Sequence, residues 1–194
     1  MKKVILAFVL IAGSVITANA QFVKLGVKGG ANFADITGDN TESIDMRTSF
    51  HIGGVAELIM SDSFSFQPEV IYSSQGGKQS YGDTDVTLKL DYINVPFMAK
   101  IYPVKGLSLE VGPQVGFLIN DSVEFDGEDL SAEYEISDDL REVDFGANFG
   151  LGYKFDNGFF LNGRYNLGLA NLIDDDSDNK IHNGVIQVSA GFFF

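Results

Sequence analysis

The sequence predicts an all-β fold, an eight-stranded antiparallel up-and-down transmembrane β-barrel. Three observations predict it: an export signal at the N-terminus, eight segments in which apolar and polar residues alternate, and connections that are short and long in turn. The composition agrees, because 17 Phe and 7 Tyr beside 22 Gly favour many short strands over helices. Barrels of the bacterial outer membrane have an even number of strands, short turns at one end and long loops at the other.

Residues 1–20 have the three parts of a secretory signal peptide. Lys2 and Lys3 form the positive region, residues 4–17 are apolar, and Ala18-Asn19-Ala20 is an A-x-A cleavage motif. We therefore expect cleavage between Ala20 and Gln21, which leaves residues 21–194 as the barrel domain. The alternative, a membrane helix, is disfavoured because the apolar run is shorter than the roughly 20 residues that a span needs.

The charge of the mature chain is strongly negative. Removing Lys2 and Lys3 from the 13 basic residues leaves 11 against 27 acidic ones, a formal net charge of −16. Nucleic acid is therefore not an expected partner. The chain has no cysteine, which excludes both disulfides and acylation on Cys.

Eight strands follow from the alternation, in chain order. The predicted ranges are 22–33, 49–60, 64–74, 87–102, 107–119, 143–155, 159–170 and 184–194. Three connections are short and rich in turn-forming residues, namely 61–63 (SDS), 103–106 (PVKG) and 156–158 (DNG). The polar connections between them are long, and cover 34–48, 75–86, 120–142 and 171–183.

The two faces of the strands indicate which side meets lipid. In 107–119 one face is aliphatic and aromatic, and the other carries Ser108, Glu110, Gly112, Gln114 and Gly116. Glycines weaken a strand and pack nothing, so a water-exposed face is a poor place for them. Inside a narrow barrel they leave room for long charged side chains, and the apolar face then meets lipid. Aromatic residues near both ends of the strands agree with interfacial girdles.

Three prolines fall inside predicted strands, where each removes a ladder hydrogen bond. Near Pro96 the apolar phase shifts, from Leu88, Leu90 and Tyr92 to Val95, Phe97, Ala99 and Ile101, which predicts a β-bulge. Pro68 and Pro113 show no such shift.

The stretch LDYINVPFMAKIYPVKGLSLEVGPQVGFLI, residues 90–119, resembles the fourth and fifth strands of the PorT-like outer membrane β-barrel family of Bacteroidetes. Residues 25–36, residues 158–172 and the aromatic C-terminus are similar to that family as well. The resemblance implies an eight-stranded barrel in the cell outer membrane, inserted by the barrel-assembly machinery, which reads a C-terminal aromatic strand; Phe192 and Phe194 would form this assembly signal. It implies little about activity, since one relative is linked to a secretion system and most have no assigned role.

Charged residues with inward phase are nearly balanced, five cationic and four anionic. We expect them to form a structural salt-bridge network in a closed lumen, because buried charges must be paired; a conducting or proton-relaying lumen is the alternative. They are Lys24, Lys28, Glu57, Glu69, Lys100, Glu110, Asp144, Lys154 and Arg164.

Acidic residues concentrate in the long connections. Asp174, Asp176 and Asp178 have the i, i+2, i+4 spacing of a calcium loop, but Asn179 stands where a turn glycine is needed and Val185 where a bidentate Glu would close the site. A solvated acidic rim is the preferred interpretation, and no metal or other cofactor is expected.

The two histidines, His51 and His182, are expected at the outer rim. Together with Ser49, Asp45 or Asp178 they could build a lipid hydrolase or acyltransferase, but no motif supports one. We therefore expect no catalytic residues and no enzyme activity.

The sequence as a whole predicts a monomeric integral outer membrane protein whose acidic extracellular loops carry its role: adhesion, interaction with other envelope proteins, or structural stabilisation. Its expected surroundings are outer membrane lipid and lipopolysaccharide. Three alternatives stay open: a rim-located envelope-lipid enzyme, a component or accessory of an outer-membrane secretion system, and a soluble secreted β-protein.

Overall fold

The computed structural model describes residues 23–38, 45–81, 84–127, 130–134, 141–170 and 181–194. The predicted signal peptide with its Ala20–Gln21 cleavage site lies outside these residues, and so does the loop of Asp174, Asp176 and Asp178. No helix in the described part of the chain is long and apolar enough to cross a membrane.

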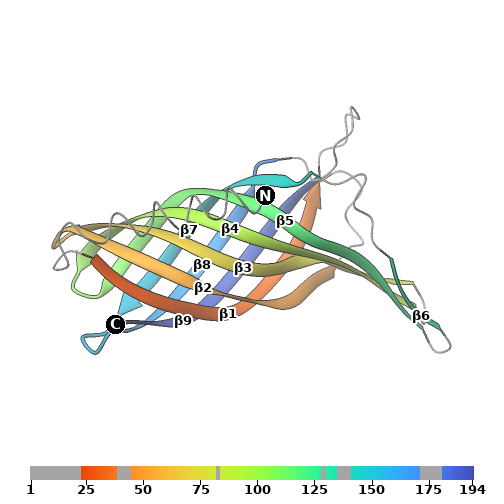
Figure 1. Cartoon of the computed structure of the whole chain (residues 1–194), viewed down its shortest axis with the longest axis horizontal. Helices are drawn as coiled ribbons and strands as arrows, with labels where there is room; N and C mark the ends of the chain where they lie inside the picture. Colours follow the sequence, from red (N-terminus) through yellow and green to blue (C-terminus); the bar gives the residue numbers. More distant parts are fainter. Residues whose placement is uncertain (1–22, 39–44, 82–83, 128–129, 135–140, 171–180) are drawn as a thin grey trace.

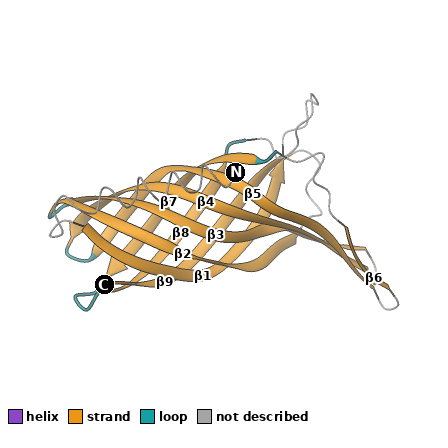
Figure 2. Cartoon of the chain, in the orientation of Figure 1, coloured by secondary structure: helices purple, strands orange, loops and turns teal. Residues whose placement is uncertain are grey.

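Eight antiparallel strands form a closed ring, as the alternation predicts (Figures 1 and 2). Each strand of the ring pairs with the next ring strand along the chain, with β5 pairing directly with β7, and the pairing of β1 with β9 closes the ring. A short ninth strand, β6, stands outside the ring and, among the strands that the structure describes, pairs with β5 alone. The strands are β1 (Val23–Gly38), β2 (Asp45–Ser61), β3 (Phe64–Tyr81), β4 (Thr84–Val104), β5 (Leu107–Gly127), β6 (Leu130–Tyr134), β7 (Val143–Lys154), β8 (Phe159–Gly168) and β9 (Ile181–Phe193).

All three predicted short turns lie at one end of the barrel and connect β2 to β3, β4 to β5 and β7 to β8. Gly106 and Gly158 have φ of 87° and 90° in the second and third of these turns. Residues other than glycine rarely adopt this region, which explains why both turns carry Gly. Because outer-membrane barrels keep their short turns on the periplasmic side, this end is the periplasmic one.

The predicted inside and outside faces of β7, β8 and β9 agree with the burial pattern. In β8 every second residue is buried, and Phe159, Leu161, Tyr165 and Leu167 between them are exposed on the lipid side. In β9 Phe192 faces outward, whereas Phe193 is only 4 % exposed and packs against Phe160 with 4.8 Å between ring centroids.

The predicted phase shift near Pro96 is wrong. Burial continues without a break through Leu90, Tyr92, Pro96 and Lys100, so Leu90 and Tyr92 face the interior rather than lipid. The β4–β5 register changes elsewhere, because Asp91 pairs with Asn120 whereas Tyr92 pairs with Leu118, which leaves Ile119 as an extra residue in β5. The apolar character of Leu90 and Tyr92 is misleading because the lumen also holds apolar side chains.

Strands β4 and β5 are the longest of the ring and are much longer than a membrane requires. A spanning strand needs about 9–11 residues; β7, β8 and β9 have 12, 10 and 13, but β4 and β5 have 21 each. About ten surplus residues at about 3.3 Å each add about 30 Å of strand. The connections predicted as long loops around 75–86 and 120–142 are therefore partly strand, and these strand ends extend away from the barrel at the end opposite the short turns (Figure 1).

Candidate functional site

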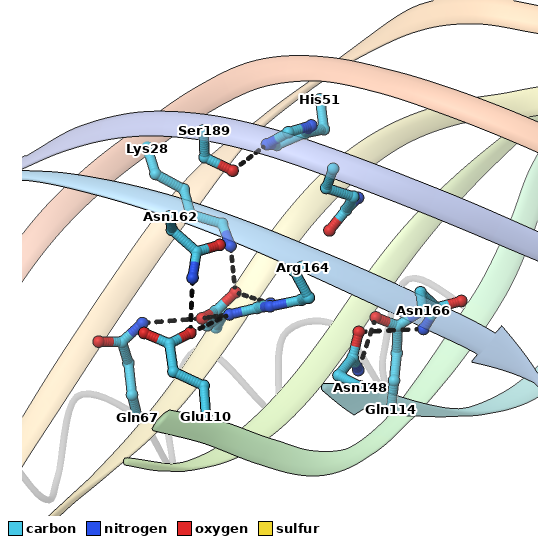
Figure 3. A network of polar contacts seen from close by, with 12 residues as sticks. Lys28, His51, Gln67, Glu110, Gln114, Asn148, Asn162, Arg164, Asn166 and Ser189 are labelled. Carbon is cyan, nitrogen blue, oxygen red and sulfur yellow. Dashed lines mark hydrogen bonds and ion pairs between the residues drawn. The ribbon is translucent and has the colours of Figure 1, made fainter. Parts of the chain in front are cut away.

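The barrel interior is a layered polar network, and Figure 3 shows Arg164, Gln67 and Glu110 close together in it. Its centre is the buried carboxylate of Glu69 on β3. Arg164 Nη1 and Nη2 donate to the two oxygens of Glu69 at 2.9 and 2.8 Å, and Lys28 Nζ lies 2.8 Å from Oε2. Gln67 Nε2 donates to Oε1 at 2.8 Å. The four side chains come from β1, β3 and β8, so this carboxylate joins strands on different sides of the ring.

Glu110 on β5 is the second carboxylate of the cluster. It accepts hydrogen bonds from Asn162 Nδ2 at 2.7 Å and from Ser108 Oγ at 3.0 Å, and Lys100 Nζ lies 3.1 Å away. Arg164 Nη2 reaches it at 3.3 Å, which links it to the first carboxylate. Each buried negative charge thus has several charged or polar donors, the condition under which a buried ion pair is tolerated.

Glu57 forms a third group near the periplasmic mouth. It accepts from Tyr102 Oη, from Ser65 Oγ at 3.0 Å and from Lys154 Nζ at 2.7 Å. Lys154 Nζ also lies over the rings of Tyr102 and Phe193, 5.1 and 5.7 Å from their centroids. Tyr102 therefore helps to close the mouth. Its position near a strand end is typical of an aromatic girdle on the lipid side, but it lies two residues from Lys100 and so shares the inward face of β4.

Towards the other end of the barrel, amides, hydroxyls and one histidine make most of the hydrogen bonds. Asn32 Nδ2 donates to Ser73 Oγ and Ser74 O at 2.9 and 2.7 Å, and Asn166 donates to Asn148 at 3.1 Å. His51 is only 1 % exposed, so the expectation of a rim histidine is wrong for this residue. His51 and Glu57 lie an even number of residues apart on β2 and so share the inward face, a pattern that indicates an interior position for His51.

Asn32, His51 and Ser189 form a chain of hydrogen bonds, and their side chains are of the types found in some hydrolase triads. Asn32 Oδ1 lies 2.8 Å from His51 Nδ1, and Ser189 Oγ lies 2.8 Å from His51 Nε2. Since Oδ1 can only accept, Nδ1 carries the proton and Ser189 donates to Nε2. Gly30 lies between the partners, paired with His51 on one side and Ser189 on the other, and its missing side chain lets the imidazole reach across β1.

This triad has no access to a substrate. The exposed fractions of Asn32, His51 and Ser189 are 0, 1 and 3 %, inside a barrel whose lipid is on the other face. Of the rim combination considered from the sequence, Ser49 Oγ donates to the Ser74 carbonyl at 2.6 Å rather than to a histidine, Asp45 is exposed, and Asp178 lies outside the described residues. His182 donates through Nδ1 to the Ala170 carbonyl at 3.0 Å. No group of three or more His, Asp or Glu within the described ranges could hold a metal ion.

The structure places seven of the nine expected lumen charges in these clusters and two elsewhere. Lys24 is exposed at the periplasmic mouth, because it lies at the start of β1 where the ring ends. Asp144 is buried near the opposite end of β7 and takes part in none of the ion pairs found within the described residues.

Beyond the last β5–β7 pair, the surplus ends of β3, β4 and β5 pair with one another and with β6 (Figure 1). We call residues 74–81, 84–91, 120–127 and 130–134 the protruding sheet; its base still contacts the barrel, because Ser74 accepts from Asn32 and Lys78 pairs with Asp45 of β2. Ion pairs cross between its strands, Lys78–Asp85 at 2.7 Å and Lys89–Glu124 at 2.7 Å. Leu118 and the β5 residues beyond it have no partner on β7, whose last pair is Val143 with Phe117. Within the described residues nothing pairs with the outer edge of β6.

Comparisons with known proteins agree with this architecture. Neisserial surface protein A (NspA) superposes with a TM-score of 0.54 at 12 % sequence identity, over 88 % of this chain and 97 % of that one. Ail, the attachment invasion locus protein of Yersinia pestis, superposes with a TM-score of 0.52 at 12 % identity, over 88 % and 98 %. At this identity the likeness is one of fold.

The sequence comparisons complete the assignment. No curated protein matches the sequence. A family profile does: that of the outer membrane protein beta-barrel domain matches residues 18–174. With this match and the closed eight-stranded ring, the chain belongs to the outer membrane protein beta-barrel domain family and is a protein of the cell outer membrane.

Proposed function

We propose that this protein is a non-enzymatic, monomeric outer membrane barrel that recognises other macromolecules at the cell surface through the protruding sheet. The observation that carries the proposal is the outer edge of β6, with which no residue of the described ranges pairs, on a sheet that extends about 30 Å beyond what the membrane requires. An exposed sheet edge offers unpaired N–H and C=O groups, with which an extended segment of a partner can pair.

The filled lumen supports a role outside the barrel. Glu57, Glu69 and Glu110 are each 4 % exposed or less, and all three are held by donors from other strands. A transport function would need these contacts to open, whereas surface recognition leaves them unchanged. The names of NspA and Ail, a surface protein and an attachment invasion locus protein, are in keeping with a surface role.

Within its family, we assign the chain to the PorT-like group of Bacteroidetes barrels. The stretch that carries the resemblance is the β4–β5 hairpin. Its Tyr92, Pro96 and Lys100 face the interior, as do Gln114 and Gly116 on the adjacent strand. The resemblance thus lies in residues that build the barrel interior, and the protruding sheet is where this chain can have its own specificity.

The test compares cells that display the complete protein with cells in which a short Gly-Ser linker replaces residues 123–140. This change removes β6 and the tip of β5 but keeps every pair between β5 and β7. We expect attachment to immobilised extracellular proteins or to neighbouring cells to fall to background, with equal amounts of heat-modifiable barrel in the membrane. The matched control is the same linker in place of residues 171–180. Equal attachment by the 123–140 variant and the complete protein would disprove surface recognition by this sheet.

A further inference from the structure

At the periplasmic mouth, three lysines surround a cavity of about 400 Å³. Lys24 comes from the start of β1, Lys105 from the β4–β5 turn and Lys154 from the end of β7. Phe155, Phe193 and Phe194 form the apolar part of its wall. Segments far apart in the sequence thus contribute side chains of two kinds, cationic and aromatic, to one cavity.

The positive charges of this cavity are only partly compensated by the protein. Lys154 Nζ lies 2.7 Å from Glu57 Oε2, which compensates part of its charge. Lys105 Nζ lies 2.7 Å from Asp156 Oδ1, and this hydrogen bond raises the pKa of Lys105, which therefore remains an ammonium ion. Both members of that pair are more than 80 % exposed, so water screens it and it is easily exchanged for another anion.

Lys24 is the least compensated of the three. It is exposed and takes part in no ion pair within the described residues, and its charge acts unfavourably on that of Lys154. Three of the 11 basic residues of a mature chain with 27 acidic ones thus gather at this mouth. An anion among the three ammonium groups would relieve the repulsion.

The depth of the cavity in the membrane indicates which kind of anion binds there. Exposed aromatic rings surround this end of the barrel, with 4.9 Å between the centroids of Tyr153 and Phe155 and 6.0 Å between those of Phe192 and Phe194. Such rings lie at the level of the lipid headgroups. Phe155 and Phe194 belong both to this belt and to the cavity wall, so a molecule with its phosphate on the lysines has its acyl chains beside the belt.

We propose that this cavity binds the phosphate of a phospholipid of the inner leaflet of the outer membrane. Lys24 and Lys105 hold the phosphate, Lys154 adds charge from behind, and the aromatic belt holds the first acyl carbons. The site is independent of the protruding sheet, which lies at the opposite end of the barrel.

Native mass spectrometry of the mature protein in dodecyl maltoside tests the proposal. The probes are dioleoylphosphatidylglycerol, inorganic phosphate, and dioleoylglycerol, which has the same chains without phosphate. The test variant is Lys24→Ser with Lys105→Ser; Lys154 stays because it also binds Glu57. The control, Lys78→Ser with Lys89→Ser, makes the same charge change in the protruding sheet.

We expect one retained phosphatidylglycerol in the wild type and the control, and about 30-fold weaker binding in the test variant, since each basic residue near anionic lipid contributes about a fivefold change. Lys24→Arg with Lys105→Arg should retain the lipid. Equal retention by the test and control variants, absence of a retained lipid, or equal retention of dioleoylglycerol would overturn the site. Inorganic phosphate binding as tightly as the lipid would overturn the lipid as its ligand.

Discussion

Replacing Glu69 by Gln tests whether the lumen network holds the barrel together. The substitution keeps the size of the side chain and removes the charge that Arg164 and Lys28 share at 2.8 Å each. Their side chains are 1 % exposed, so water cannot take over the role of the carboxylate. Removing one partner of a buried ion pair costs about 3–5 kcal/mol, and we expect the free energy of unfolding to fall by that amount.

The matched control is Glu124→Gln in the protruding sheet. Glu124 pairs with Lys89 at 2.7 Å, as short as the buried pairs, but its side chain is 43 % exposed. An exposed ion pair contributes about 1 kcal/mol or less. The two substitutions therefore make the same chemical change and differ in burial.

The assay is guanidinium-induced unfolding of the mature barrel refolded into lipid vesicles, followed by far-UV circular dichroism because the chain has no Trp. Adding Lys28→Met to Glu69→Gln should restore more than half of the lost stability, because it removes a cation that the first change leaves unpaired. If Glu69→Gln destabilises the barrel no more than Glu124→Gln, the network does not hold the ring, and the reasoning from burial fails.

Four further predictions concern other parts of the barrel. Gly30→Ala should prevent assembly, because its Cβ would lie 1.9 Å from the Val188 carbonyl oxygen, whereas Gly54→Ala, with no atom within 4 Å, should assemble normally; heat-modifiable gel mobility compares them. A fluorophosphonate probe should leave Ser189 unlabelled in the folded barrel. If the wild-type barrel is labelled and the Ser189→Ala variant is not, a reagent can reach the triad. Planar-bilayer recordings should show no discrete steady conductance, and a reproducible channel would contradict a closed lumen. Deleting Phe194 should impair membrane insertion without stopping export; normal insertion would remove its role as an assembly signal.

The fold was largely predictable from the sequence because alternation and turn chemistry are local signals. From Val143 to Lys154 apolar residues that face lipid alternate with residues that face the lumen. Gly106 and Gly158 mark turns whose positive φ angles favour glycine. The phase near Pro96 is not predictable in this way, because apolar character alone does not distinguish a lipid-facing residue from one in a partly apolar lumen. Leu90 and Tyr92 are buried against other strands of the ring, and only the tertiary structure decides this.

The candidate site was predictable in kind but not in its contacts. Inward phase identifies Glu69 and Arg164 separately, 95 positions apart in the sequence. That they form a two-point ion pair depends on the stagger of the strands around the ring, which no local pattern encodes. The same holds for Asn32, His51 and Ser189, which lie at inward positions but come together only because β1 pairs with both β2 and β9.

The protruding sheet differs physically from an ordinary surface loop. Strand β4 runs for 21 residues, and its pairing with β3 continues from Ile101 at the periplasmic end to Thr84 at the tip. The described strands of the tip therefore continue the strands that the lumen network fixes, and they are paired with one another without a partner. A preordered surface loses less conformational entropy on binding than a flexible loop of the same length. A sheet that only capped the barrel would gain nothing from about 30 Å of extra strand, so the length itself favours recognition at a distance from the membrane surface.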